Sequence, residues 1–206
     1  MKFIRRILIL TIVFLSIYSC TEEYDNNKSK DKDEVDSKKE TKPDLALAGT
    51  YFSNAESKRS SKDYNGAIED FTKAIEIDSK YDAAYIDRGV SKHILGDYNG
   101  AIEDYNKAIE IDINSNIGYF YRGISKFNLK DYNGAIQDCN KAIEINPTQA
   151  YAYYNRGNAK YNLGDEKGAC TDWQKCTELE KHSIDWQKNV DPAYIKASDL
   201  ISKYCK

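Results

Sequence analysis

A sixteen-residue motif occurs three times in this chain of 206 residues, at a strict interval of 34 residues. Residues 63–78 read DYNGAIEDFTKAIEID, residues 97–112 read DYNGAIEDYNKAIEID, and residues 131–146 read DYNGAIQDCNKAIEIN. The first two copies agree at 14 of their 16 positions, and a looser fourth copy begins at Asp165. This period is typical of stacked helix–turn–helix units, each too small to bury its own apolar face. The repeat predicts an all-α solenoid and favours a binding scaffold over a catalyst.

The repeated segment, taken as residues 47–183, resembles the tetratricopeptide repeat (TPR) family, in units at 48–81, 82–115, 116–149 and 150–183. The family pattern has a ring at position 4, a small residue at 8, alanine at 20, a large ring at 24 and alanine at 27. The matching residues are Tyr51, Tyr85, Tyr119 and Tyr153; Ala55, Gly89, Gly123 and Gly157; Ala67, Ala101, Ala135 and Ala169; Phe71, Tyr105 and Trp173, with Cys139 in the third unit; and Ala74, Ala108 and Ala142, with Cys176 in the fourth. The resemblance implies a TPR superhelix of four repeats.

The ends of the helices are also marked in the sequence. An aspartate opens the second helix of each unit, where its side chain can accept a hydrogen bond from a free backbone N–H. These aspartates are Asp63, Asp97, Asp131 and Asp165. Gly96 and Gly164 suit a left-handed turn after the first helix, whereas Lys62 and Lys130 take that place in the other two units. Residues 184–206 are expected to form a loop and a capping helix, because Asp191–Lys206 has apolar residues at helical spacing.

The first 20 residues have the features of an export signal. Lys2, Arg5 and Arg6 precede the apolar run Ile7–Ser19, and Cys20 ends it. Thirteen residues in a helix span only about 20 Å, which is too short for a bilayer core of roughly 30 Å. Residues 1–19 are therefore interpreted as a signal peptide. The end of the run resembles a bacterial lipobox, which implies cleavage before Cys20 and acyl chains such as palmitate on the mature protein. Ordinary secretion is the alternative.

Residues 20–46 are expected to be a disordered tether after the lipidated Cys20. The segment from Thr21 to Asp44 has six lysines and nine acidic residues, and it has too few apolar side chains to offset the entropy of ordering. Loss of Lys2, Arg5 and Arg6 with the signal peptide takes the net charge from −3 to −6. Since the chain has no basic stripe, nucleic acid is not expected as a partner. The expected location is the bacterial cell envelope, with membrane attachment through the lipid.

Four further cysteines lie in the repeats and the capping helix. They are Cys139, Cys170, Cys176 and Cys205, and their spacing fits neither a redox nor a zinc motif. If the capping helix packs antiparallel to the helix before it, Cys170 and Cys205 come together and can form a disulfide. Four buried thiols are the alternative.

Catalytic residues and a metal or cofactor site are not indicated by the sequence. The two histidines, His93 and His182, lie in different repeats, and neither a nucleophile elbow nor a glycine-rich phosphate loop is present. We therefore expect neither catalysis nor a cofactor. Arginine recurs at position 7 as Arg88, Arg122 and Arg156, and aspartate recurs at position 23 as Asp70, Asp104, Asp138 and Asp172. These residues form either an anion-binding ladder or, as we favour, structural ion pairs between packed helices.

Positions 2, 5, 9 and 12 of the first helix line the concave groove of a TPR array, and here they are largely apolar and aromatic. The candidate groove residues are Phe52, Ile86, Val90, Ile117, Phe120, Ile124, Phe127, Tyr151, Tyr154 and Tyr161. The terminal-carboxylate clamp of the chaperone-adaptor members is missing. The alternative is that these side chains pack only on one another. We interpret the chain as a lipid-anchored scaffold that binds an apolar peptide or helix of a partner protein. A structural lipoprotein that docks laterally in an envelope complex is the second hypothesis.

Overall fold

A computed structural model describes residues 44–180 and 197–205, which lie within one compact unit, Pro43–Lys206. In these residues the regular structure consists of nine helices, without a strand. The helices are α2 (Leu45–Ser60), α3 (Tyr64–Ile77), α4 (Asp82–Ile94), α5 (Tyr98–Ile111), α6 (Asn116–Asn128), α7 (Tyr132–Ile145), α8 (Ala150–Asn162), α9 (Glu166–Glu180) and α10 (Ala197–Tyr204). The predicted all-α fold is confirmed.

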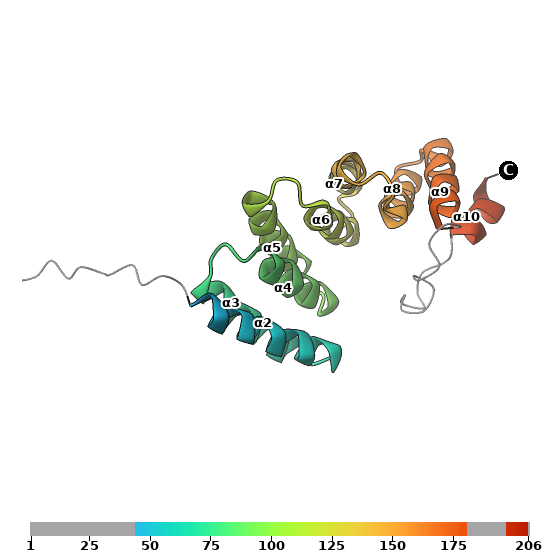
Figure 1. Ribbon diagram of the computed structural model, residues 1–206. Coiled ribbons are helices and arrows are strands. Elements are labelled where there is room, and N and C mark those ends of the chain that lie inside the picture. Colours follow the sequence, from blue (N-terminus) through green and yellow to red (C-terminus); the bar gives the residue numbers. More distant parts are fainter. Residues whose placement is uncertain (1–43, 181–196, 206) are drawn as a thin grey trace, which may run out of the picture. The chain divides into compact units, whose positions relative to one another are not determined.

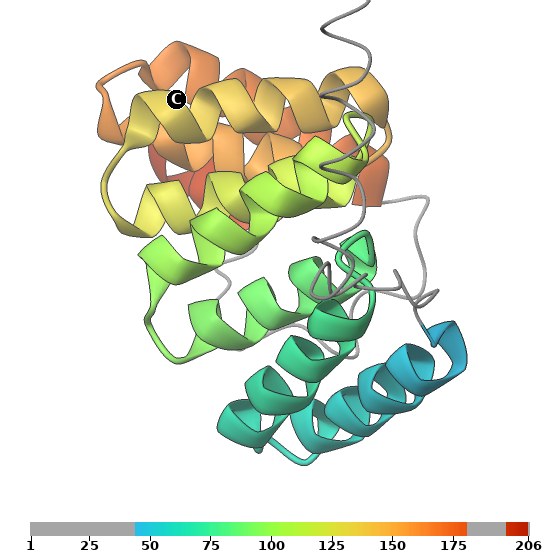
Figure 2. The same ribbon diagram turned by 90° about the vertical axis from the view of Figure 1, so that its left-hand side faces the viewer.

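The helices pack as four antiparallel pairs that follow one another along the chain (Figures 1 and 2). The pairs are α2 with α3, α4 with α5, α6 with α7, and α8 with α9, and each pair also contacts the next. The first helices of the pairs, α2, α4, α6 and α8, contact one another in sequence and are called the first-helix row below. Helix α10 packs on α9 at the end of the array, as expected for a capping helix.

The predicted aspartate caps are present in all four pairs. Each aspartate carboxylate accepts a hydrogen bond from the backbone N–H of the glycine three residues later, at 2.9–3.0 Å. A Cβ atom on that glycine would collide with the capping carboxylate. The DYNG sequence is thus one device: the aspartate begins the helix, and the glycine makes room for it.

The turn between the two helices of each pair has a left-handed residue, as the sequence indicates. Gly96 and Gly164 have φ values of 85° and 86°, and Lys62 and Lys130 have φ values of 66° and 63°. Glycine adopts this region without steric cost, whereas a lysine is strained there.

Small residues and rings fill the space between the paired helices. Phe71, Tyr105 and Trp173 are fully buried beside the invariant alanines. A Cβ atom on Gly89 would lie 2.6 Å from the Tyr105 ring, and one on Gly157 would lie 2.7 Å from Trp173. The small residue at position 8 is therefore required by the ring at position 24 of the same repeat.

The recurring arginines and aspartates form structural ion pairs, as favoured from the sequence. Asp138 accepts hydrogen bonds from Arg122 Nε at 2.9 Å on Oδ2 and from Nη2 at 2.6 Å on Oδ1, and Lys126 Nζ lies 2.8 Å from Oδ2. The third nitrogen, Nη1, donates to Asn106 of the preceding repeat at 2.7 Å. The same arrangement joins Arg88, Lys92, Asp104 and Thr72, and Arg156, Lys160, Asp172 and Asn140. The lysine head groups are thus held by aspartate and do not simply extend into water.

Two sequence expectations concern the ends of the described residues. Helix α2 begins at Leu45, so residues 45 and 46 are helical and do not belong to the tether expected over 20–46. The reason is the Asp44 side chain, which accepts a hydrogen bond from Leu47 N at 3.1 Å and caps the helix. The expected signal peptide, Cys20 and the tether up to residue 43 lie outside the described residues. So do residues 181–196, which include the expected loop and the first part, 191–196, of the expected capping helix.

Candidate functional site

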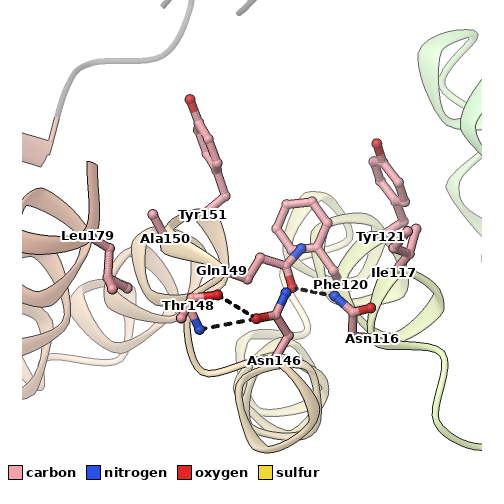
Figure 3. A pocket seen from close by; sticks show the side chains of 10 residues that line it. All are labelled: Asn116, Ile117, Phe120, Tyr121, Asn146, Thr148, Gln149, Ala150, Tyr151 and Leu179. Carbon is pink, nitrogen blue, oxygen red and sulfur yellow. Dashed lines mark hydrogen bonds between the residues drawn. The ribbon is translucent and has the colours of Figure 1, made fainter. Parts of the chain in front are cut away.

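An apolar pocket opens where the third and fourth helix pairs meet. Its volume is about 410 Å³. It lies between the amino-terminal ends of α6 and α8, the α7–α8 connection and the end of α9 (Figure 3). The lining residues are Asn116, Ile117, Phe120, Tyr121, Asn146, Thr148, Gln149, Ala150, Tyr151 and Leu179. Figure 3 shows the Tyr121 and Tyr151 side chains on opposite sides of the pocket, with Phe120 between them.

The polar rim of this pocket is fixed by short hydrogen bonds. Asn146 accepts from the backbone N–H of Thr148 at 3.2 Å and from its hydroxyl at 2.8 Å, which closes the α7–α8 turn. Gln149 at the end of that turn accepts from Asn116 Nδ2 at 3.1 Å. The last bond ties the start of α6 to the start of α8. Together these bonds link the α7–α8 turn to the start of α6.

The pocket residues differ in how firmly they belong to the core. Phe120 is half-buried and packs against a buried cluster that includes Ile109 and Tyr119. Tyr121 stacks on Tyr105, with ring centroids 5.9 Å apart, and burial raises its pKa. Ile117 is 47% exposed although it is a large aliphatic residue. Ile117 thus offers apolar surface that the fold itself does not cover.

The opposite end of the first-helix row is charged. Arg59 of α2 lies between two carboxylates: Nη1 is 3.0 Å from Asp87 of α4, and Nη2 is 3.8 Å from Glu56. His93 Nδ1 lies 2.8 Å from the Ser125 hydroxyl and joins α4 to α6. The first-helix row therefore passes from an acidic, polar section at α2 and α4 to an apolar section at α6 and α8.

Family models match four segments of the chain. The description "Tetratricopeptide repeat" matches residues 48–81, 83–114 and 150–183, and "TPR repeat" matches residues 125–164. Together these segments make up more than half of the chain. The chain belongs to the tetratricopeptide repeat family.

Several solved structures are similar to this chain in fold. A crystal structure of MamA protein is 25% identical, with a TM-score of 0.62 over 67% of this chain and 75% of that one. MamA from Desulfovibrio magneticus RS-1 is 19% identical, with a TM-score of 0.63 over 70% and 80%. The first TPR of Spaghetti (RPAP3), bound to the HSP90 peptide SRMEEVD, is 20% identical, with a TM-score of 0.59 over 60% and 98%. Among curated protein sequences, none matches this chain.

Three of the groove residues proposed from the TPR positions line the pocket: Ile117, Phe120 and Tyr151. Four more, Ile86, Val90, Ile124 and Phe127, are half-buried on α4 and α6. Because α6 turns every 3.6 residues, Ile117, Phe120 and Ile124 share one face of that helix.

The other three proposed residues are engaged within the fold. Tyr154 is 8% exposed and belongs to the core cluster around Trp173, so it is not an open groove residue. Tyr161 packs on Tyr204 of α10, with centroids 4.7 Å apart, because the capping helix lies over it. Phe52 lies 4.9 Å from the ring of Tyr81 and 5.4 Å from that of Phe71. The apolar site therefore lies between α6 and α8 and does not extend along the whole array.

The remaining pocket residues were not proposed from the sequence. They are Asn116, Tyr121, Asn146, Thr148, Gln149, Ala150 and Leu179. Most lie in or beside the α7–α8 connection, which the first-helix positions do not include. The available signal was the sequence NPTQA at residues 146–150, whose Asn and Pro mark a turn that differs from the DINSN of the preceding repeat.

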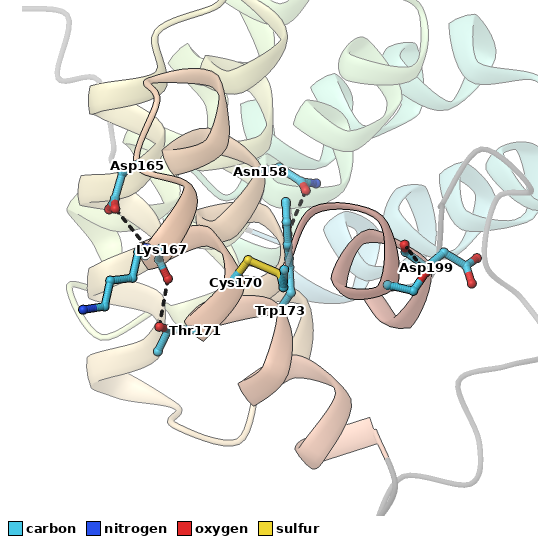
Figure 4. The surroundings of a disulfide bond; sticks show 10 residues. Asn158, Asp165, Lys167, Cys170, Thr171, Trp173 and Asp199 are labelled. Carbon is cyan, nitrogen blue, oxygen red and sulfur yellow. Dashed lines mark hydrogen bonds between the residues drawn. A yellow bond between two sulfur atoms is a disulfide. The ribbon is translucent and has the colours of Figure 1, made fainter.

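A disulfide joins Cys170 of α9 to Cys205, just after α10 (Figure 4). This is the pairing that the sequence analysis weighed against four buried thiols. Their Cα atoms are 5.7 Å apart. Leu200, Ile201 and Tyr204 of α10 pack against the cluster around Trp173. The capping helix is thus held by apolar contacts and by a covalent bond. Cys139 and Cys176 are buried thiols.

Two kinds of site are absent from the described residues. No group of three or more His, Cys, Asp or Glu side chains among them could hold a metal ion. None of their helices combines the length and apolar character that crossing a membrane requires.

Proposed function

We propose that this protein is a lipid-anchored scaffold of the bacterial cell envelope that binds an apolar peptide or helix of a partner protein. The segment would lie along the first-helix row, with an apolar side chain in the pocket beside Phe120. The observation that carries the proposal is this pocket, with a largely apolar lining and a half-exposed Ile117. Binding would remove that apolar surface from water. The proposed role involves neither catalysis nor a cofactor.

The size and chemistry of the pocket support an anchoring role. A volume of about 410 Å³ accommodates one or two large side chains and is small for an extended ligand. The rim offers amide groups of Asn116 and Gln149 that can exchange hydrogen bonds with a peptide backbone.

The peptide complex of the RPAP3 TPR supports the general binding mode. That neighbour holds the peptide SRMEEVD, whose sequence is acidic. For this chain we propose the same use of a TPR array with a different ligand chemistry, because aromatic and aliphatic side chains make up most of the pocket lining here.

The lipid anchor is the second part of the proposal. It rests on the basic start, the apolar run of residues 7–19 and Cys20 at its end. The charged segment that follows would hold the TPR array away from the membrane, with a reach set by its length.

Site-specific photocrosslinking tests the binding site. A photoreactive amino acid is placed at Ile117 in the pocket or, as the control, at Ile113 in the α5–α6 turn, which is 66% exposed and does not line the pocket. We expect Ile117 to crosslink a discrete partner in cells and Ile113 not to. Ile117→Gln should reduce capture of that partner by about tenfold with little change in melting temperature. Equal crosslinking from both positions would argue against a specific groove.

Lateral docking in an envelope complex is the second candidate, and one surface feature favours it. Leu95, Leu129 and Leu163 directly follow the first helices of three repeats and are 48%, 42% and 48% exposed. They recur every 34 residues and form a regular apolar series. If this series is the interface, Leu129→Gln will abolish complex assembly while Ile117→Gln leaves it intact. Size-exclusion chromatography of envelope extracts separates the two hypotheses.

A further inference from the structure

The acidic section of the first-helix row has more carboxylates than cations. Asp87 and Glu56 share a single guanidinium, that of Arg59, and their side chains remain 20% and 47% exposed. Tyr81 lies close by: burial raises its pKa, and the negative charges of Glu56, Asp78, Asp82 and Asp87 raise it further. The local charge is therefore negative even with Arg59 in place.

The arginines farther along the array do not balance this charge. Arg88, Arg122 and Arg156 each donate two hydrogen bonds to an aspartate and a third to the preceding repeat. Three of the five N–H donors of each guanidinium are therefore used within the fold, and its charge is paired with an aspartate. An anionic ligand would thus find Arg59 shared by two carboxylates and the other three arginines engaged.

The acidic section is continuous with the apolar pocket. Asp87 in α4 and Tyr121 in α6 occupy the same repeat position, 34 residues apart, and α4 contacts α6. Tyr121 lines the pocket. Asp87 and Arg59 are close enough to Tyr121 to act on its pKa, which burial raises first. The axes of neighbouring packed helices lie about 8–10 Å apart. We therefore take roughly 10 Å as the spacing between the Asp87 carboxylate on α4 and the pocket beside α6.

We propose that the bound segment is both apolar and basic, with an apolar anchor in the pocket beside Phe120 and a Lys or Arg against Asp87 and Glu56. This inference rests on the proposed function and adds the charge of the partner. A separation of roughly 10 Å corresponds to about three residues of an extended segment or about two turns of a helix. The cation gains two carboxylates that already lie partly out of water, and these are only half neutralised by Arg59.

Fluorescence anisotropy with defined peptides tests this inference on the purified full chain. The probes are labelled peptides with blocked ends, one set extended and one set helical, each with a single Phe anchor. In each set the residue at the stated spacing is Lys, Gln or Glu. We expect the Lys peptide to bind about tenfold more tightly than the Glu peptide at low salt, with a smaller ratio at high salt. The Gln peptide should lie between them.

Substitutions in the chain assign the preference to the acidic section. The double variant Glu56→Gln/Asp87→Asn should remove the preference for Lys and keep affinity for the Gln peptide. Glu144→Gln is the matched control, because Glu144 pairs with Lys141 on α7, is well exposed and does not line the pocket. It should leave the preference unchanged. Circular dichroism verifies that the double variant, which loses the Arg59 bridge between α2 and α4, remains folded.

The outcomes separate the two proposals. If Phe peptides bind with equal affinity whatever the neighbouring charge, the partner is not basic, although the proposed groove stands. A preference for the Glu peptide would also overturn the inference and point to Arg59 as an anion contact. If none of the peptides binds, both proposals fall.

Discussion

Asp138 illustrates how single residues hold this array together. Its carboxylate is 4% exposed and is surrounded by two nitrogens of Arg122 and by Lys126. Through Arg122 it also connects to Asn106 of the preceding repeat. Removing one member of such a buried network leaves the charges of the others uncompensated, which costs more than the lost contact alone.

We expect Asp138→Ala to lower the free energy of unfolding by about 3–5 kcal/mol, because it leaves Arg122 and Lys126 without their shared anion. Urea denaturation followed by circular dichroism measures the change. The exposed pair Lys141–Glu144 on the same helix gives a control, since Glu144→Ala should cost no more than about 1 kcal/mol. Similar losses in both variants would contradict a special role for the buried aspartate.

His93 gives the stability of the array a pH dependence. Its Nδ1 atom lies 2.8 Å from the Ser125 hydroxyl, and its ring packs on Tyr98 at 5.0 Å. Burial lowers its pKa below the ordinary value of 6.5. The folded protein therefore binds this proton less readily than the unfolded chain does. Stability from neutral His93 is complete above about pH 6.5 and is lost as the pH falls through the lower folded pKa.

The melting temperature of the wild type should thus fall between neutral pH and about pH 5, and His93→Gln should lose much of that dependence. Differential scanning calorimetry across this range measures the effect. Any remaining slope in the variant is assigned by adding His182→Gln, which removes the other histidine. An unchanged pH profile in His93→Gln would show that this histidine is not linked to folding.

At the scale of single residues, the caps, the turn residues and the arginine–aspartate pairs were predicted correctly from the sequence. Each of them recurs at the same position of the 34-residue repeat, so the repeat itself reveals it. The groove residues were harder to assign. Tyr154 and Tyr161 occupy the same positions in their repeat as Phe120 and Phe127, yet the first is buried and the second lies under α10. The burial of a repeated position depends on which element packs beside it. The last repeat is followed by the capping helix α10 and not by another repeat, so its residues are covered differently.

At the scale of elements, α10 has only eight residues and depends on its attachments. An isolated helix of this length is not stable in water. Its apolar side contacts the Trp173 cluster, and the Cys170–Cys205 disulfide closes a loop over a sequence separation of 35. The same helix covers Tyr161, so the integrity of the last repeat depends on it.

Cys205→Ser should lower the free energy of unfolding by about 3–4 kcal/mol. Without the disulfide, the unfolded chain is no longer restricted by a closed loop and gains conformational entropy. Hydrogen exchange should then show early opening of α10 and of Tyr161. Dithiothreitol should destabilise the wild type in the same way and leave Cys205→Ser unaffected. Peptide mapping that finds Cys170 and Cys205 both reduced in the protein from its native compartment would contradict the bridge.

Burial raises the pKa of Cys139 to about 12, so this thiol should react slowly with iodoacetamide in the folded protein.

The limits of sequence reasoning at this scale lie at the ends of the repeats. Helix α2 starts at Leu45 because the Asp44 side chain caps it. Asp44 is one of many charged residues in this part of the sequence, so the sequence does not single it out as a cap. The pocket depends on the α7–α8 connection, where Asn146 bonds Thr148 within the turn and Gln149 accepts a hydrogen bond from Asn116 of α6. Such contacts involve residues that are not part of the periodic pattern, so the period does not predict them.

At the scale of the whole molecule, the proposed anchor determines where the array acts. Cys20→Ala should yield an unprocessed or soluble product, because the acylated residue is lost. Detergent-phase partitioning separates anchored from soluble protein, and the intact mass of the wild type reports the acyl chains. Cys139→Ala serves as the control for loss of a cysteine elsewhere and should partition like the wild type. A wild-type mature mass without acyl chains would refute the anchor.

The junctions between repeats have a genetic consequence. Each arginine reaches back to a polar residue of the preceding repeat and pairs within its own repeat, and this pattern is the same at three junctions. A deletion or insertion of one whole period of 34 residues would therefore join matching junctions, and the array could change its length without a new interface.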